Sequence, residues 1–275
     1  MEIGGAVSAP VSISYDEFTA QPGKVLPVTI ECAKNPVGGG LVSHAEWTGV
    51  SMASLLKNAR PAAEARFVRL SGADGYTRVL PLAKSLHGDT LIVSGMNGGK
   101  LPINHGFPFR AIVPGGYGMD SVKWLRKIDV LVEEEVQPHP YEWRVRALLG
   151  GSRRDGGVTA MSVKSVFSRP LERAILSRRR FVVRGAAWAG ENRIRRVEVS
   201  ADGGKSWTTA QLDSEPLPYA WVGWSFVWKI PKAGAHELAV RATDEKGREQ
   251  PERRQSDRVD DFENNAWHTV RVTSL

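Results

Sequence analysis

The single cysteine of this chain, Cys32, lies where the sequence changes from strand-forming to turn-forming residues. A β-branched run over residues 28–30, followed by Glu31, precedes it, and the turn formers of residues 35–40 follow it. One cysteine cannot form an internal disulfide bond, so that structural use is excluded. Four interpretations remain: a small buried hydrophobic side chain, a nucleophile, a redox thiol, or a ligand to a soft metal.

A second stretch with chemical potential runs from residue 96 to residue 125. It combines glycines and prolines with His105, Arg110, Ser121 and Lys123. Glycines let backbone N–H groups approach a ligand, and Ser, Lys and Arg side chains add donors, a combination that suits a phosphate or another polyanion. Taken alone, the composition favours an ordinary loop that His105 pins, with Arg110 in a surface ion pair, and Lys123 could be a solvated lysine at a strand end.

The elements that must position these residues differ between the two halves of the chain. Over residues 1 to about 130, short strand patterns alternate with short helical patterns. Strands are expected at residues 26–31, 66–70, 90–94 and 111–113, and helical segments at 15–20, 52–57 and 82–86. This mixture is typical of an α+β domain.

Residues 133–157 have the composition of a linker, with three glutamates followed by prolines and paired glycines. Beyond them the pattern is nearly all β, and the residues Asp202-Gly203-Gly204 favour a hairpin turn. Strands are expected at residues 181–188, 195–200, 207–212, 225–230, 236–242 and 267–272. Strands at this spacing indicate an immunoglobulin-like sandwich. We therefore expect an α+β domain at 1–157 and an all-β domain at 158–275.

Composition limits the classes of partner. The formal charge of +7 favours anionic ligands, but no zinc-finger or RNP-like pattern accompanies the basic residues, so nucleic acid is not expected. No apolar run approaches the roughly 20 residues that span a bilayer. The N-terminus lacks the features of a signal peptide. As written, the chain is expected in the cytoplasm, or in the periplasm if a longer form carries an export signal.

Blocks along nearly the whole chain resemble the sulfite oxidase family of molybdenum enzymes and follow the family's order. Two are specific: Asn-His-Gly-Phe-Pro-Phe-Arg at residues 104–110 and Val-Lys-Trp-Leu at residues 122–125. The other blocks lie at residues 29–35, 45–50, 113–115, 185–190, 197–204, 241–244 and 265–268.

The resemblance implies a molybdopterin-binding oxidoreductase domain followed by a dimerisation domain, and therefore a homodimer. It implies that Cys32 is the catalytic thiolate that binds molybdenum on a pyranopterin. It also implies that His105, Arg110, Ser121 and Lys123 surround the phosphate of this cofactor. The cofactor would supply oxo transfer, and the protein would supply orientation and charge.

Three departures from the family pattern bear on the substrate. The chain begins downstream of the family's Arg-Asn-His segment, so it resembles an N-terminally shortened member. Pro36-Val37 follow Asn35 in place of an arginine pair, and Asp260 falls about where a substrate arginine is expected. A dianion such as sulfite needs such cations. We therefore expect a small oxyanion or an S- or N-oxide as substrate, with sulfite used poorly.

The route of the electrons is limited by the absence of further cofactor motifs. A single cysteine excludes a Cys-x-x-Cys-His haem attachment, and the sequence has no cytochrome b5-like segment and no dinucleotide-binding fingerprint. Electrons are expected to pass to a separate protein such as a cytochrome. The alternative is a non-catalytic or cofactor-poor relative that acts as a structural or interaction protein.

Overall fold

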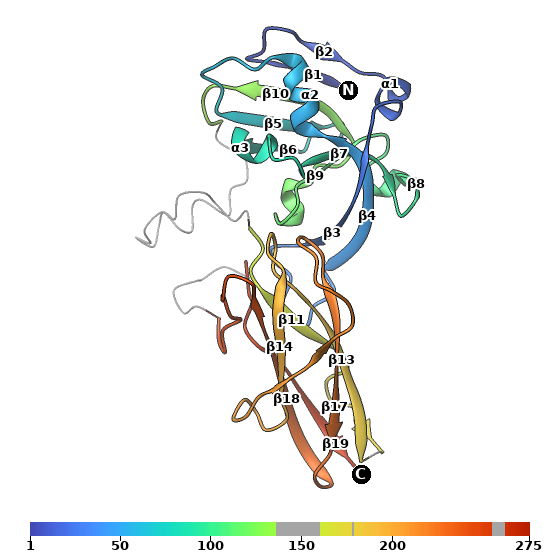
Figure 1. Ribbon diagram of the computed structural model, residues 1–275, viewed down its shortest axis with the longest axis vertical. Coiled ribbons are helices and arrows are strands. Elements are labelled where there is room, and N and C mark those ends of the chain that lie inside the picture. Colours follow the sequence, from blue (N-terminus) through green and yellow to red (C-terminus); the bar gives the residue numbers. More distant parts are fainter. Residues whose placement is uncertain (136–159, 178, 255–261) are drawn as a thin grey trace. The chain divides into compact units, whose positions relative to one another are not determined.

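The computed structural model describes residues 1–135, 160–177, 179–254 and 262–275 (Figure 1). The chain divides into two compact units. The first contains Met1–Ile30 and Ala45–Thr159, and the second contains Glu31–His44 and Ala160–Leu275. The segment Glu31–His44, which includes Cys32, thus groups with the C-terminal part of the chain. The boundary expected at residues 157 and 158 lies outside the described residues and stays a prediction.

Two sheets form most of the first unit. One has the order β2-β1-β10-β5-β6, in which β1 and β10 are parallel and the other neighbours are antiparallel. Its strands are β1 (Glu2–Gly5), β2 (Val11–Ser12), β5 (Phe67–Gly72), β6 (Thr77–Pro81) and β10 (Leu125–Leu131). The other has the order β3-β4-β7-β8, and β9 also pairs with β7. Its strands are β3 (Lys24–Glu31), β4 (Val42–Ser51), β7 (Leu91–Met96), β8 (Gly99–Lys100) and β9 (Arg110–Ile112).

Helices in the described part of this unit are short. They are α1 (Tyr15–Thr19), α2 (Met52–Ala59), α3 (Leu82–Ser85) and the 3-10 turns η1 (Ile103–His105) and η2 (Gly118–Asp120). In α1, Ser14 and Glu17 form a capping box, which satisfies backbone donors at the helix start. In α2, Leu55 and Leu56 are fully buried in the core with strand residues such as Leu70. The described part of the unit is therefore mostly sheet, and α1, α2 and α3 lie where the sequence pattern predicted helical segments.

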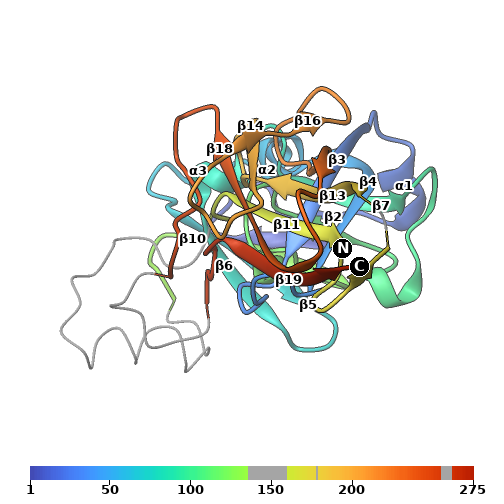
Figure 2. The ribbon, with the colours of Figure 1, turned by 90° about the horizontal axis from the view of Figure 1, so that it is seen from below.

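Two sheets also form the second unit. One has the order β11-β13-β17-β16, with β11 (Lys164–Arg169), β13 (Arg180–Trp188), β16 (Gln211–Leu212) and β17 (Val222–Lys229). The other has the order β12-β19-β18-β14-β15, with β12 (Ile175–Leu176), β14 (Ile194–Ser200), β15 (Thr208–Thr209), β18 (Gly234–Asp244) and β19 (His268–Ser274). In Figure 2, β14 and β18 lie side by side, as their backbone pairing requires.

The two sheets of the second unit share one hydrophobic core. Val183 and Trp224 enter it from one sheet, and Val197, Leu238 and Val240 enter it from the other. This arrangement is a two-sheet sandwich, and its immunoglobulin-like character stays a prediction. The Asp-Gly-Gly turn follows β14 as expected, and Gly203 and Gly204 have φ values of 72° and 91° that favour glycine.

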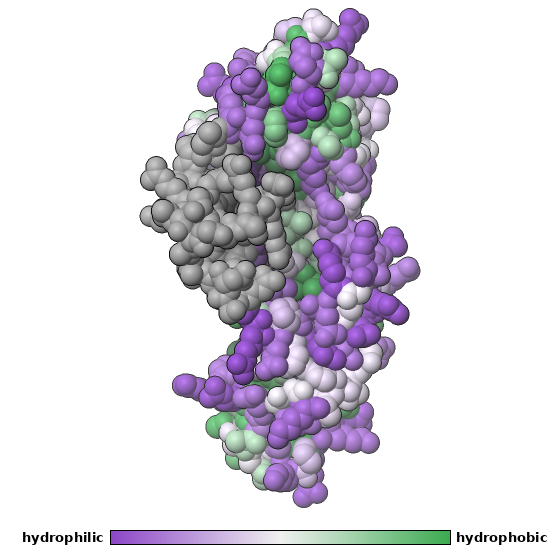
Figure 3. Space-filling view, turned by 90° about the vertical axis from the view of Figure 1, so that its left-hand side faces the viewer, coloured by the Kyte–Doolittle hydropathy of each residue, from purple (hydrophilic) through white to green (hydrophobic). Residues whose placement is uncertain are grey.

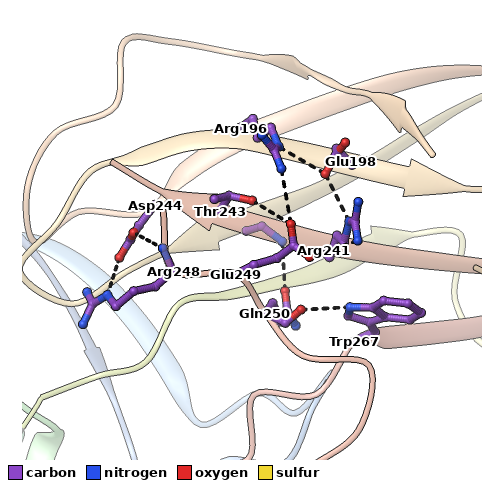
Figure 4. A network of polar contacts seen from close by, with 10 residues as sticks. Arg196, Glu198, Arg241, Thr243, Asp244, Arg248, Glu249, Gln250 and Trp267 are labelled. Atoms are coloured by element: carbon purple, nitrogen blue, oxygen red, sulfur yellow. Dashed lines mark hydrogen bonds and ion pairs between the residues drawn. The ribbon is translucent and has the colours of Figure 1, made fainter. Parts of the chain in front are cut away.

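A buried amide joins the two sheets of this sandwich (Figure 4). The side-chain oxygen of Gln250 accepts from the backbone N–H of Ser165 on β11 (2.8 Å) and of Ala242 on β18 (3.2 Å). Its side-chain nitrogen donates to the carbonyl of Ala266 at 2.7 Å. Because these partners belong to different strands, Gln250 fixes β11 against β18.

Much of the surface of the described residues is polar (Figure 3). In the view of Figure 3, hydrophilic residues cover much of the described surface, with smaller hydrophobic areas between them. Within the described ranges, none of the helices combines the length and the apolar composition required to cross a membrane.

Candidate active site

Cys32 directly follows the last residue of β3 and begins the loop that leads to β4. Its side chain is exposed, which excludes a small buried hydrophobe. Its backbone is held on both sides: the Cys32 N–H donates to the carbonyl of Leu41 at 2.9 Å, and the Asn35 N–H donates to the carbonyl of Cys32 at 2.8 Å. The thiol is therefore accessible while the backbone that carries it is ordered.

A buried ion pair lies directly beside Cys32 in the sequence, and sequence analysis missed it. Glu31 is 1% exposed, and its carboxylate accepts from Lys164 Nζ at 2.5 Å and from Trp188 Nε1 at 2.9 Å. These partners are 133 and 157 residues away in the chain. The only local signal was a glutamate in a strand that is otherwise largely apolar.

In the first unit, Arg110 on β9 is a buried cation. The residue is 6% exposed, and its guanidinium lies 4.9 Å from the ring centre of Trp47. Nη1 donates to the carbonyl of His105 at 3.2 Å, and Nε has no hydrogen-bond partner among the described residues. Burial lowers the pKa of Arg110 to about 10, so it remains charged near pH 7. A buried charge without an anionic partner is costly, so this site favours an anion.

His105 lies close enough to both Arg110 and Lys123 to interact with them electrostatically. Burial lowers the pKa of His105, and the positive charges of Arg110 and Lys123 lower it further. The ammonium group of Lys123 donates to the carbonyl of Asn104 at 2.9 Å. The structure thus brings together three of the four residues expected at the cofactor phosphate.

Ser121, the fourth residue, is placed beside β9 by the backbone. Its hydroxyl oxygen accepts from the N–H of Val113 at 3.2 Å, and the next residue, Val122, accepts through its carbonyl from the N–H of Ala111 at 2.9 Å. The segment from Ser121 to Lys123 therefore runs along the strand that carries Arg110.

The loop before Ser121 is held by polar contacts that sequence analysis did not single out. Arg78 donates to Asp120 at 2.7 Å in a buried ion pair. The hydroxyl of Tyr76 donates to the carbonyl of Met119 at 2.9 Å. Both residues belong to the β5–β6 hairpin or its turn, so the hairpin positions η2 and with it Ser121.

These residues fit the expected cofactor. A buried guanidinium with a free Nε, a histidine and a lysine in one cluster present donors and positive charge to a phosphate. An exposed thiol on an ordered loop is a suitable soft, anionic ligand for molybdenum. Cys32 belongs to the second unit, and the other four residues belong to the first.

Comparison with known proteins agrees with this chemistry. Residues 1–139 match the family described as "Oxidoreductase molybdopterin binding domain", and residues 157–275 match "Mo-co oxidoreductase dimerisation domain". The chain belongs to the molybdopterin oxidoreductases of the sulfite oxidase family. The resemblance found in the sequence is thus confirmed.

Relatives within this family have different names. The chain is 30% identical to mitochondrial sulfite oxidase of Homo sapiens, over 98% of this chain and 56% of that protein. It is 29% identical to nitrate reductase [NADH] of Lotus japonicus, over 99% of this chain and 36% of that protein. The chain therefore spans about half the length of the former and about a third of the latter.

A solved family structure has the same fold. The crystal structure of the sulfane dehydrogenase SoxCD from Paracoccus pantotrophus superposes with a TM-score of 0.83 and 27% identity. The match covers 98% of this chain and 74% of the other. The expected roles of Cys32, His105, Arg110, Ser121 and Lys123 stay predictions, and Asp260 lies outside the described residues.

Proposed function

We propose that this chain is a molybdenum-cofactor-dependent oxidoreductase with Cys32 as the protein ligand to the metal. The observation that carries the proposal is the buried guanidinium of Arg110, whose Nε has no partner among the described residues. When bound, the molybdenum on its pyranopterin would supply oxo transfer and accept or release electrons. The residues of the chain hold and orient that group.

Each residue of the phosphate cluster has a distinct part in this proposal. Arg110 supplies a permanent charge, because its pKa of about 10 lies well above neutral pH. His105 has a lowered pKa and is neutral near pH 7, so it serves as a hydrogen-bonding group. Ser121 accepts from Val113, which leaves its own hydroxyl proton for the phosphate. Lys123 adds a second cation, whose ammonium group also donates to the carbonyl of Asn104.

The substrate we propose is a small oxyanion or an S- or N-oxide, with sulfite used poorly. The loop of residues 32–41, between β3 and β4, is called the cysteine loop. In it, Pro36 and Val37 occupy the place where the family pattern has an arginine pair. Two apolar side chains cannot pair with a dianion, since anion binding in a cleft needs cations or donors. The relatives support no single substrate, because they are named for sulfite, nitrate and sulfane.

The partners we propose are a second copy of the chain and a separate electron-transfer protein such as a cytochrome. The match of residues 157–275 to a dimerisation domain supports the homodimer. The immunoglobulin-like sandwich of residues 158–275 would supply its interface.

Metal analysis of the purified protein tests this function. We expect about one molybdenum per chain in the wild type, and loss of oxo-transfer activity with a retained fold in Cys32→Ser, since serine lacks the soft sulfur ligand. Elemental analysis, circular dichroism and turnover with an artificial electron acceptor measure the three quantities. Unchanged turnover in Cys32→Ser would refute the ligand assignment. Protein that stays molybdenum-free even after exposure to cofactor would favour the non-catalytic alternative.

A further inference from the structure

Glu31 is the residue before Cys32 in the sequence. Its carboxylate is buried, and both of its oxygens accept hydrogen bonds. Lys164 Nζ donates to one oxygen at 2.5 Å, and Trp188 Nε1 donates to the other at 2.9 Å. The side-chain nitrogen of Asn35 donates to the first oxygen at 3.0 Å. All four residues belong to the second unit.

The two distant donors come from a single point in the sandwich. Lys164 is the first residue of β11, and Trp188 is the last residue of β13. The two face each other directly in the antiparallel register of these strands. They are 3% and 1% exposed, so their positions are fixed by packing. The buried amide of Gln250 further fixes β11, because its side-chain oxygen accepts from the backbone N–H of Ser165, the residue after Lys164.

Asn35 links the buried ion pair of Glu31 and Lys164 to Leu41, at the other end of the cysteine loop. Its side-chain oxygen accepts from the N–H of Leu41 at 3.0 Å, while its side-chain nitrogen binds Glu31. Lys164 Nζ also donates to the carbonyl of Asn35 at 3.3 Å. Both ends of the loop that presents the thiol are therefore tied to one buried ion pair.

A buried ion pair contributes little net stability to a fold, because taking two charges out of water costs several kcal/mol per ion. A packed apolar pair would hold two segments together at lower cost. A directional network is useful where a nearby group must be held in one geometry. A metal-binding thiol beside it is such a group.

We propose that Glu31, with Lys164 and Trp188, is the positioning group of Cys32. The C-terminal sandwich then sets the geometry of the protein ligand to molybdenum, in addition to forming a dimer. This inference rests on the proposed function for the identity of the metal. The anchoring of the loop itself can be measured without any cofactor.

The chain offers a matched pair of variants for the test. Trp188→Phe removes an indole N–H that donates to Glu31 and keeps most of the aromatic volume. Trp224→Phe makes the same change at an equally buried tryptophan of the same sandwich, whose Nε1 has no partner among the described residues. Glu31→Gln serves as a second variant, since it keeps the shape of the side chain and removes the charge that faces Lys164.

The first measurement is amide hydrogen exchange across residues 32–41 of the cofactor-free protein. Trp188→Phe and Glu31→Gln should speed exchange there about ten-fold, as expected for the loss of one charge-assisted hydrogen bond. Trp224→Phe should leave it unchanged. Equal exchange in all variants and the wild type would overturn the proposal, whatever the metal content.

The second measurement is the thiolate-to-metal charge-transfer absorption of the molybdenum-loaded protein. The band should shift in Trp188→Phe and Glu31→Gln and stay in place in Trp224→Phe. An unchanged band with faster exchange would overturn the positioning role and leave a purely structural anchor. A wild type without molybdenum would refute the proposed function, and with it the positioning of a metal ligand, even if the exchange rates still differed.

Discussion

At the scale of single residues, the phosphate site proposed for His105, Arg110, Ser121 and Lys123 contains one buried cation, Arg110. Arg110→Ala removes a charge-assisted contact of about 1.5–3 kcal/mol, so cofactor affinity should fall roughly ten-fold or more. Cofactor occupancy at limiting cofactor measures this loss. Arg126→Ala removes an exposed arginine of β10 and is the control. Equal occupancy in the wild type and Arg110→Ala would remove Arg110 from the site.

A second residue, His268, makes the stability of the second unit depend on pH. Its Nδ1 accepts from the N–H of Phe167 at 2.9 Å, which requires that nitrogen to be unprotonated. Burial lowers the pKa of His268, while Glu172 opposes the shift. In the unfolded chain the imidazole has a pKa of about 6.5. Below that value the unfolded state binds a proton that the folded state resists, so folding stability falls.

We therefore expect that His268 does not change the free energy of unfolding above about pH 6.5. As the pH falls from there toward the pKa of His268 in the folded protein, the free energy of unfolding should decrease. Denaturant titrations between about pH 8 and pH 5 measure the slope. His268→Gln keeps an acceptor but cannot titrate, so its slope should be smaller. A wild type and a variant with the same slope would show that other groups cause the pH dependence.

At the scale of elements, local patterns predicted several segments well, but they carried no information on which strands pair. The helix expected at residues 52–57 is Met52–Ala59, and the strand expected at 26–31 is Lys24–Glu31. The strand expected at 207–212 divides at Ala210: β15 pairs with β14 in one sheet, and β16 pairs with β17 in the other. Local alternation cannot reveal such a change of sheet, because it depends on the register of distant partners.

Site residues could be predicted from the sequence only where their type and their local motif identified them. Cys32 and Arg110 stood out by residue type and by their place in recognisable blocks. The partners of Glu31 did not, because Lys164 and Trp188 reach it only through tertiary structure. The role of Arg78 could not be predicted for the same reason, because its ion pair with Asp120 joins residues that are 42 positions apart.

The β13–β17 pair also provides a test of the homodimer. Val182 and Val227 face each other in register and are 43% and 42% exposed, so they form an apolar area on the outside of this sheet. If this face lies in the interface, Val182→Asp should convert a dimer into a monomer, because a buried unpaired carboxylate is costly. Val25→Asp, at an exposed valine of the first unit, is the control.

Sedimentation at micromolar concentration distinguishes these outcomes. The wild type and Val25→Asp should have twice the chain mass of 30.1 kDa, and Val182→Asp should have the chain mass itself. A wild-type monomer that does not associate on concentration would contradict the dimer. A Val182→Asp dimer would place the interface elsewhere.

At the scale of the whole molecule, the net charge of +7 draws anions toward the protein without selecting among them. Selection requires cations at the reacting centre, and Pro36 and Val37 stand where the family pattern has an arginine pair. Loss of two charge-assisted contacts should weaken sulfite binding by at least about a hundred-fold. We expect a KM for sulfite of about millimolar or higher in steady-state assays with an artificial acceptor. A micromolar KM would show that other cations fill the pocket.

The distance in sequence between Glu31 and its partners has a consequence for biosynthesis. Cys32 leaves the ribosome early, but Lys164 and Trp188 follow 133 and 157 residues after Glu31. Since chains grow at about 5–20 residues per second, roughly 7 to 30 seconds pass between the synthesis of Cys32 and that of the residues that hold its loop. If Cys32 is the metal ligand proposed above, its loop becomes ordered only after Trp188 has been made, which favours insertion of the metal after that point. The position of Cys32 is thus fixed by residues that are synthesised much later than the cysteine itself.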